Sequence, residues 1–282
     1  MKISIVTINY NNAEGLRRTL ESVASQTYRD IEHIVIDGGS DDGSVEIIKE
    51  YVNQCMTYDV LWVSEKDKGI YDAMNKGVKR ATGDYVWILN SGDSVAAPDV
   101  VEKMMAILNG GTIDLLLGNI VRVYANRKEY APLPVKRMKD EIPRSMDVSM
   151  LTFYTGTVPQ DAAFVRRELF AQYGYFDDTM KICADWKLYL IMIALGGVQP
   201  MHVNIDAVLF DMTGISNAND ELRIAERRTY LEEALPASVR MDYDAYAFPI
   251  RQYQRLKRHH MWGVVNFMER VLFKLEKWHI LK

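Results

Sequence analysis

The apolar segment 85–89 ends abruptly in Asn90, Ser91, Gly92 and Asp93. The segment itself is typical of a short buried strand. Packing gives a buried strand no reason to end in an amide, a hydroxyl and a carboxylate. In open α/β sheets, ligands bind beyond the carboxyl ends of the strands. Because carboxylate oxygens are ligands that Mg²⁺ prefers, we expect Asp93 to hold a divalent cation.

The three strands predicted before this one also end in polar residues. Asn9, Asp37 and Asp67 stand at or just beyond their ends. One acidic residue in such a place needs no functional explanation, because Asp is a good N-cap for the helix that follows. Four polar strand ends in succession are not explained by capping alone. The sequence therefore predicts that these residues and Asp93 line one edge of a sheet and bind a ligand there.

The first 95 residues alternate between strand and helix patterns. Continuous apolar or β-branched runs predict buried strands, and apolar residues three and four positions apart predict helices. The predicted strands are residues 3–8, 32–36, 60–63 and 85–89, and the predicted helices are residues 13–26, 45–51 and 70–81. This alternation implies a mostly parallel sheet with right-handed crossovers and flanking helices. The expected fold class is α/β with a Rossmann-like central sheet.

The pattern after Asp93 is less regular. We expect helices at residues 98–108, 164–173, 185–195 and 221–235, strands at 113–117 and 203–210, an antiparallel ribbon within 118–134, a loop over the site at 136–149, and a helical tail from residue 250. These expectations follow from the period of the apolar residues and from the positions of Gly and Pro.

Two phosphate-binding motifs are absent from the sequence. The glycine-rich segment 37–44 lacks the Gly-Lys-Ser/Thr ending of a Walker A loop. No Gly-x-Gly-x-x-Gly follows the first strand, which argues against a dinucleotide-binding Rossmann enzyme. A nucleotide would have to be held in another way.

Composition narrows the partners and the compartment. The net charge of −4 argues against nucleic acid as the main partner. Cys55 and Cys183 have no metal-ligand spacing, and so few cysteines favour a reducing cytosol. The N-terminus has no signal-peptide pattern, and the longest apolar run, residues 188–198, is shorter than the roughly 20 residues of a membrane span. We therefore expect a cytoplasmic protein without a membrane-spanning helix.

The tail, residues 250–282, carries eight basic and two acidic residues, so its net charge is +6. Apolar residues recur among the basic ones, as in amphipathic helices that bind anionic membrane surfaces. The same pattern also fits a helix that packs on the body of the protein, and the sequence does not separate the two. Membrane contact would place the protein at the inner face of the cell membrane.

Four segments follow one another in a fixed order. They are Ile-Val-Thr-Ile-Asn-Tyr-Asn-Asn at residues 5–12, Ile-Asp-Gly-Gly-Ser-Asp-Asp-Gly-Ser at 36–44, Ser-Glu-Lys-Asp-Lys-Gly-Ile-Tyr-Asp-Ala-Met-Asn-Lys-Gly at 64–77 and Ala-Thr-Gly-Asp-Tyr-Val-Trp-Ile-Leu-Asn-Ser-Gly-Asp at 81–93. Together they resemble the motifs of the family 2 glycosyltransferases, with a weaker match over residues 158–190. The resemblance implies an inverting enzyme with the GT-A fold, of the branch that builds bacterial capsule, exopolysaccharide or O-antigen. Its substrates would be a nucleotide-sugar donor, expected to be a UDP-sugar, and a glycan or lipid-linked glycan acceptor.

The resemblance also implies roles for individual residues. Asp93, the last residue of a DxD-like motif, would bind Mg²⁺ or Mn²⁺ on the diphosphate, and Asp185 would be the catalytic base. The expected nucleotide-binding residues are Ile8, Asn9, Tyr10, Asp37, Asp67, Asn75, Ser91 and Gly92, and the expected donor or acceptor sugar contacts are Gln160 and Trp186. A GT-A domain would span residues 1–218, with its nucleotide-binding half at 1–95 and its acceptor and catalytic half at 96–218. A helical region with the basic amphipathic tail, residues 219–282, would follow.

Two departures from the family pattern keep other interpretations open. Ser91 replaces the first carboxylate of a full DxD, and Ala184 stands where Glu is common. From its position alone, Asp185 is better explained as a helix N-cap than as a catalytic residue. A non-catalytic subunit that binds nucleotide sugars is one alternative. A sugar nucleotidyltransferase is another, disfavoured because residues 9–12 do not form a glycine-rich loop.

Overall fold

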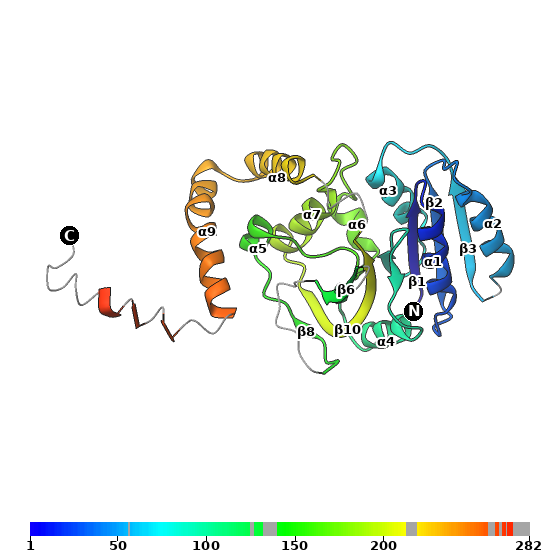
Figure 1. Cartoon of the computed structure of the whole chain (residues 1–282), viewed down its shortest axis with the longest axis horizontal. Helices are drawn as coiled ribbons and strands as arrows, with labels where there is room; N and C mark the ends of the chain where they lie inside the picture. The colour runs from blue at the N-terminus through cyan, green and yellow to red at the C-terminus, as the bar shows by residue number, and fades with distance from the viewer. Residues whose placement is uncertain are drawn as a thin grey trace. The chain divides into compact units, whose positions relative to one another are not determined.

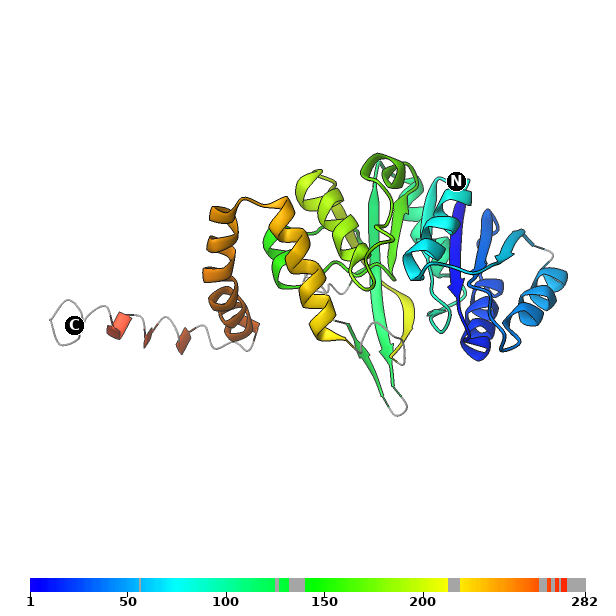
Figure 2. The same ribbon diagram turned by 90° about the horizontal axis from the view of Figure 1, so that it is seen from above.

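A computed structural model of the chain describes residues 1–55, 57–124, 127–131, 140–212 and 219–258, and also residues 263–264, 267–268 and 270–272. The chain forms two compact units, Met1–Tyr230 and Leu231–Lys282. Figures 1 and 2 show it in two views related by a quarter turn. The first unit contains the central sheet and every residue expected in the site.

The N-terminal half alternates strand and helix as predicted. Its elements are β1 (Ile3–Asn9), α1 (Ala13–Ala24), β2 (Ile31–Asp37), α2 (Ser44–Gln54), β3 (Asp59–Ser64), α3 (Ile70–Arg80) and β4 (Tyr85–Ile88). Strand β1 lies between β2 and β4 and is parallel to both, and β2 is parallel to β3. The carboxyl ends of these strands therefore lie at one edge of the sheet (Figure 1).

Helices cover both faces of this parallel part. Leu16 of α1 and Ile48 of α2 pack in one cluster with Val35 of β2. The next residue of β2, Ile36, points to the opposite face, where Gly77 of α3 lies. A side chain at Gly77 would come within 2.3 Å of Val6, so the glycine allows α3 to pack closely on β1. Every residue of β1 and β2 is buried, so neither strand alternates between apolar and polar residues.

The second half of the unit is mixed. Its elements are β5 (Ser94–Val95), α4 (Val100–Asn109), β6 (Leu115–Val123), β7 (Lys128–Tyr130), β8 (Arg144–Ser145), α5 (Met150–Thr155), β9 (Ala163–Arg166), α6 (Glu168–Tyr173), α7 (Ala184–Tyr189), the π-helix η1 (Leu190–Leu195) and β10 (Pro200–Asp211). The strand order of the whole sheet is β3-β2-β1-β4-β9-β6-β10-β5. Strand β9 runs antiparallel to both β4 and β6, whereas β10 is parallel to β6. The α/β expectation is confirmed, and the parallel part is confined to the first four strands and the β6–β10 pair.

Two expectations for this half were wrong in their details. The predicted helix 164–173 begins as strand β9, because Phe164 and Val165 are buried between β4 and β6. Residues 144–145, expected in a loop over the site, pair as β8 with His202 and Met201 near the start of β10. Residues 140–143 and 146–149 of that predicted loop have no helix or strand, as expected, and residues 136–139 lie outside the described residues.

The predicted helix 185–195 changes type along its length. It begins as α7 and continues as η1, where Gly196 N donates to Ile191 O over 2.7 Å. Hydrogen bonds that span five residues define a π-helix, a form that is often found near functional sites. Strand β6, Leu115–Val123, extends from the predicted strand into the predicted ribbon and makes the expected antiparallel pair with β7.

The C-terminal region is helical where it is described. Helix α8 spans Asp220–Ala234 and α9 spans Ala237–Arg258, with Pro249 inside it. The helix predicted from residue 250 therefore begins earlier, and the predictions for residues 259–262, 265–266, 269 and 273–282 lie outside the described part. In the part of the chain that the structure describes, no helix has the length and the hydropathy that crossing a membrane requires.

His33 should make the fold sensitive to mild acid. Its ring is fully buried between Thr7 Oγ1 at 3.0 Å and the Tyr51 hydroxyl at 2.7 Å, and burial lowers the pKa of His33 to about 3. The unfolded chain takes up this proton near pH 6.5 and the native state does not, so stability present above pH 6.5 is lost as the pH falls towards 3. Between pH 7.5 and 5.0 we expect this residue to lower the free energy of unfolding by about 2 kcal/mol.

Urea unfolding of the wild type and of His33→Gln at both pH values measures this effect. The glutamine can still bond to Thr7 and Tyr51 but does not titrate, so its stability should change less with pH. Comparing the two proteins removes the contributions of all other titrating groups, which they share. Equal pH dependence in both would contradict the prediction.

Candidate functional site

The carboxyl ends of β1, β2 and β3 bring Asn9, Asp37 and Ser64 side by side. Asp37 accepts hydrogen bonds from Asn9 Nδ2 at 2.8 Å, from Ser64 Oγ at 2.7 Å and from both the backbone and the hydroxyl of Ser40 at 3.0 and 2.5 Å. Burial would raise the pKa of Asp37, but these hydrogen bonds hold it below its ordinary value. Asp37 is therefore a fixed anion at the base of the first loops.

A shallow cradle lies beside this anion. Tyr10 is 66% exposed at the end of β1, and a Cβ atom added at Gly38 would lie 3.1 Å from its ring and 3.0 Å from Asp67 Oδ2. Gly38 thus separates an exposed aromatic face from a carboxylate. Such a pair can hold a heterocyclic base, through stacking on the ring and hydrogen bonds to the carboxylate.

Lys76 on α3 fixes the position of Asp67. Its ammonium group is hydrogen-bonded to Asp67 and also contacts Glu65 at 3.0 Å and Asp72 at 3.4 Å. Burial raises the pKa of Asp67, and the Lys76 charge opposes this shift. The ion pair holds the Asp67 side chain at the wall of the cradle.

Asp93 lies just beyond β4 and is 4% exposed. Its Oδ1 accepts a hydrogen bond from Asp211 N at 2.9 Å, and its backbone oxygen accepts one from Thr19 Oγ1 at 2.6 Å. Burial raises the pKa of Asp93 well above its ordinary value, and the charges of Asp161 and Asp211 raise it further. Asp93 is therefore a buried carboxylate whose negative charge is only partly compensated.

The residues before Asp93 shape the turn that carries it. Gly92 has φ of +105°, a conformation that side chains rarely adopt, and its N–H donates to Thr19 Oγ1 at 3.0 Å. The Asn12 side chain donates to the backbone oxygen of Ser91 at 3.1 Å. The loop after β1 and helix α1 thus hold the turn in place.

Two acidic residues that were not predicted as site residues, Asp161 and Asp211, interact with Asp93. Asp161 precedes β9 and accepts a hydrogen bond from Asn90 Nδ2 at 3.3 Å. Burial and the charge of Asp185 raise the pKa of Asp161 to about 7. Asp211 ends β10 and pairs with Arg18 at 3.0 Å. A polar residue at a strand end was the signal used for Asp93, and the same signal is present at Asp211.

Asp185 lies in the first turn of α7, but it is not the N-cap. Cys183 occupies the N-cap position and makes no side-chain capping bond, whereas Asp185 Oδ1 accepts a hydrogen bond from the Tyr71 hydroxyl at 2.9 Å. Burial raises the pKa of Asp185, and the hydrogen bond from Tyr71 and the charge of Arg227 oppose this shift. A carboxylate with a raised pKa can accept a proton near neutral pH.

Four other residues that the sequence assigned to the site either form hydrogen bonds within the protein or are buried in a strand. Gln160 donates to Ile88 O at 3.0 Å, and Trp186, 1% exposed, donates to Phe153 O at 2.9 Å. Asn75 exchanges two hydrogen bonds with the backbone of Phe176. Ile8 is buried within β1. Direct contact of these four side chains with a ligand remains a prediction.

The residues around Asp93 suit a cation that shares its ligands with a substrate. No group of three His, Cys, Asp or Glu side chains among the described residues is arranged to hold a metal ion. Asp93 nevertheless belongs to a cluster of carboxylates in which the charges of Asp161 and Asp211 raise its pKa, and the nearby Asn90 Oδ1 is buried with no hydrogen-bond partner among the described residues. Oxygen ligands of this kind fit Mg²⁺ or Mn²⁺, and substrate oxygens and water would complete the coordination.

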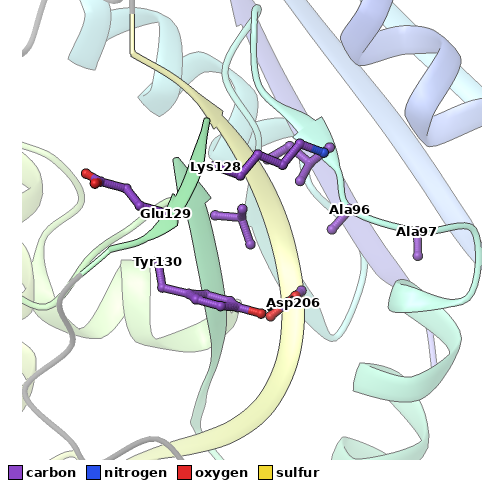
Figure 3. A pocket seen from close by; sticks show the side chains of 8 residues that line it. Ala96, Ala97, Lys128, Glu129, Tyr130 and Asp206 are labelled. Carbon is purple, nitrogen blue, oxygen red and sulfur yellow. Dashed lines mark hydrogen bonds between the residues drawn. The ribbon is translucent and has the colours of Figure 1, made fainter. Parts of the chain in front are cut away.

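A separate cavity of about 400 Å³ lies beside β10, in the part of the sheet formed by β5, β6, β7 and β10 (Figure 3). Tyr130 and Asp206 line it, with a hydrogen bond of 3.0 Å between the hydroxyl and Asp206 Oδ2. Asn119 donates to Asp206 Oδ1 at 2.9 Å. The cavity is lined by none of the residues that the sequence assigned to the site.

A side chain at Gly38 should block the cradle. In Gly38→Val the new carbons would lie against the ring of Tyr10 and the carboxylate of Asp67, because a Cβ atom there already approaches both within about 3 Å. We expect nucleotide affinity to fall about tenfold or more, since base stacking contributes about 1–3 kcal/mol. Isothermal titration with the nucleotide measures the loss.

Gly111→Ala is the matched control, because nothing lies within 4 Å of a Cβ atom at Gly111. The control should bind like the wild type. Unchanged affinity in Gly38→Val would show that the base does not use this cradle.

Comparison with known proteins agrees with this geometry. The family model described as Glycosyl transferase family 2 matches residues 4–174. The uncharacterized glycosyltransferase Rv1514c of Mycobacterium tuberculosis is 36% identical over 220 residues, which cover 76% of this chain and 77% of that protein. The PGL/p-HBAD biosynthesis glycosyltransferase of Mycobacterium bovis is 23% identical over 255 residues, 90% of this chain and 91% of that one.

Solved structures show the same fold. TarS of S. aureus in complex with UDP superimposes with a TM-score of 0.61 at 20% identity, over 75% of this chain and 61% of that one. The mannosyltransferase PcManGT of Pyrobaculum calidifontis, solved with GDP-Man and Mn²⁺, has a TM-score of 0.52 at 20% identity, over 73% of this chain and 55% of that one. The chain therefore belongs to glycosyl transferase family 2 and is a glycosyltransferase with the GT-A fold.

Proposed function

We propose that the protein transfers a sugar from a UDP-sugar to a glycan or lipid-linked glycan, with inversion at the anomeric carbon, in the synthesis of a bacterial surface polysaccharide. One observation carries the proposal. Asp161 interacts electrostatically with both Asp93 and Asp185, so the three carboxylates belong to one site. Two carboxylates at one site can serve the two ends of a displacement, the leaving group and the attacking hydroxyl.

The donor is assigned from likeness. TarS structures contain UDP and UDP-GlcNAc, and the relative in Mycobacterium bovis is named for PGL/p-HBAD biosynthesis. In this proposal the base stacks on Tyr10 beside Asp67, and Asp37 holds the ribose or base. The fixed hydrogen bonds of Asp37 keep it ionised at the base of this site.

The transfer step needs a proton acceptor and compensation of charge on the leaving group. Asp185 would take the proton of the acceptor hydroxyl as this oxygen attacks the anomeric carbon from the side opposite the diphosphate. The Tyr71 hydroxyl orients the carboxylate through its bond to Oδ1. Mg²⁺ or Mn²⁺ bound with the donor would offset the charge of the leaving diphosphate, and Asp93 would hold the ion.

Thermal unfolding with UDP, GDP, dTDP and CMP, each with and without Mg²⁺ or Mn²⁺, tests the donor site. A ligand that binds only the native state stabilises it and so raises the unfolding temperature. At a ligand concentration of a hundred times its Kd, the stabilisation is about 2.7 kcal/mol. We expect a metal-dependent increase with UDP and the smallest increase with CMP. An increase with GDP alone would reassign the donor, and no increase with any nucleotide would refute the site.

We also propose that the tail brings the protein to the cytoplasmic face of the membrane, where a lipid-linked acceptor would lie. Val264, Phe267 and Met268 of the tail are each at least 50% exposed in the structure, among residues of net charge +6. Two unpaired cysteines, Cys55 and Cys183, suit a reducing compartment. Anionic surfaces attract such segments by about 1 kcal/mol per basic residue.

Co-sedimentation with vesicles tests the tail. The wild type should bind vesicles that contain anionic lipid and should bind neutral vesicles more weakly. Replacing Arg251, Arg255, Lys257 and Arg258 with Gln should abolish the difference. Equal binding by both proteins would exclude membrane contact through this charge.

A further inference from the structure

The segment that leads into helix α7, which carries Asp185, is held by a residue from another helix. Helix α7 has six residues, and its N-cap position provides no side-chain bond. The three N–H groups that lead into it, those of Lys181, Ile182 and Cys183, all donate to the carboxylate of Glu226 on α8, at 2.5, 3.0 and 3.0 Å. A carboxylate that accepts several backbone N–H groups is held by charge-assisted bonds, which are about twice as strong as neutral ones.

Glu226 is linked to Asp185 through the backbone of Ile182 and the hydroxyl of Tyr71. Ile182 N is bound by Glu226, and Ile182 O accepts a hydrogen bond of 2.5 Å from the Tyr71 hydroxyl. The same hydroxyl, whose single proton is shared between the two oxygens, lies 2.9 Å from Asp185 Oδ1. A shift of residue 182 would therefore move the hydroxyl that orients the carboxylate.

Arg227, also on α8, contacts Trp186, the residue that follows Asp185 in α7. Its guanidinium lies 5.1 Å from the centre of the Trp186 ring, and its Nη1 donates to Gly156 O at 3.0 Å. The Tyr230 ring meets Trp186 edge-on at 6.0 Å. One face of α8 thus contacts both the residue before α7 and the residue after Asp185.

We propose that Glu226 and Arg227 are positioning residues, through which α8 sets the location and the electrostatic environment of Asp185 without touching the substrate. This inference rests on the proposed role of Asp185 as the base. Besides Arg227, the titratable groups among the described residues that interact with Asp185 include Tyr71 on α3, Asp161 before β9, and Cys183 and Tyr189 on or beside α7.

Glu226→Gln tests the positional part. The amide keeps one oxygen and loses the second acceptor, so the loop 181–183 should shift while the donor site is left intact. We expect kcat to fall about tenfold to a hundredfold with the KM for the nucleotide sugar within twofold, because displacements of about 1 Å can cost a hundredfold. Glu221→Gln on an exposed position of α8 is the control and should match the wild type.

Arg227→Gln tests the electrostatic part, because the amide is polar but carries no charge. Burial raises the pKa of Asp185 and the Arg227 charge holds it down, so loss of this charge should move the acidic limb of the kcat profile to higher pH. A purely structural role would lower the unfolding temperature and leave this limb in place. Arg228→Gln, at an exposed position, should not move it.

Three outcomes are distinguished by adding Asp185→Asn and the nucleotide-induced rise in unfolding temperature. Loss of kcat in Asp185→Asn with unchanged kcat and pH profile in both α8 variants would overturn the positioning role alone. Full activity in Asp185→Asn would overturn the proposed function. If Glu226→Gln does not show the nucleotide-induced rise, Glu226→Asp, which keeps the charge, should restore both the rise and part of kcat, and failure to do so would count against positioning.

Discussion

Asp185→Asn should lower kcat by about a thousandfold and leave nucleotide binding unchanged. General-base catalysis typically contributes about 10² to 10⁴ in rate. The substitution keeps the size of the side chain, and the Asn oxygen can accept the same hydrogen bond from Tyr71. The ability to take a proton is lost, together with the negative charge that raises the pKa of Asp161. Turnover with a nucleotide-sugar donor and the thermal shift with its nucleotide measure the two halves of this prediction.

The pH profile of the wild type should agree with the same assignment. A base must be deprotonated, and burial raises the pKa of Asp185 above that of a free Asp. Activity should therefore fall with decreasing pH through a midpoint above 3.8, the ordinary Asp value. Asp178→Asn, on the exposed loop before α7, should keep full activity. Similar losses in both variants would indicate damage to the loop, and no loss in either would remove Asp185 as the base.

The half of the site at the parallel strands could be predicted because its signals are local. Each strand is an apolar run that ends in a polar residue, and parallel pairing then places Asn9, Asp37 and Asp93 at one edge whatever the details of the turns. Asp67 is reached by the same reasoning, although its position also depends on Lys76, nine residues later. Burial on both faces makes this pattern strong.

The other half depends on contacts that leave no local pattern. Asp161 interacts with Asp185 and Asn90, which are far from it in the chain. Glu226 binds the backbone of residues 181–183, more than 40 positions earlier. A carboxylate that binds the backbone of a distant segment looks, in sequence, like any exposed residue of a charged helix. The π-helix has the same cause, because Leu190–Leu195 is apolar throughout and its hydrogen-bond pattern is set by tertiary packing.

Asp93→Asn should abolish the metal-dependent part of nucleotide binding, lower transfer by roughly a thousandfold, and make the ligand-free protein more stable. Electrostatic compensation at the leaving group is among the largest contributions to such rates, often about 10² to 10³ for one group. The gain in stability has a separate cause. Burial raises the pKa of Asp93, and the charges of Asp161 and Asp211 raise it further. Ionisation of Asp93 at neutral pH therefore lowers the free energy of unfolding.

The sign of this stability change follows from the direction of the shift. The native pKa of Asp93 lies above the unfolded value of 3.8, so the cost is absent below pH 3.8 and present in full once the pH exceeds the native pKa. Asparagine can keep the bond from Asp211 N and carries no charge. At pH 7.5 the variant should unfold at a higher temperature, by about 2–4 °C per kcal/mol for a chain of this size. Asp59→Asn, at an exposed position, is the control and should change neither the unfolding temperature nor the metal-dependent nucleotide binding. An Asp93→Asn variant that was less stable than the wild type would contradict the electrostatic argument. If it also kept metal-dependent nucleotide binding, it would contradict the metal role of Asp93.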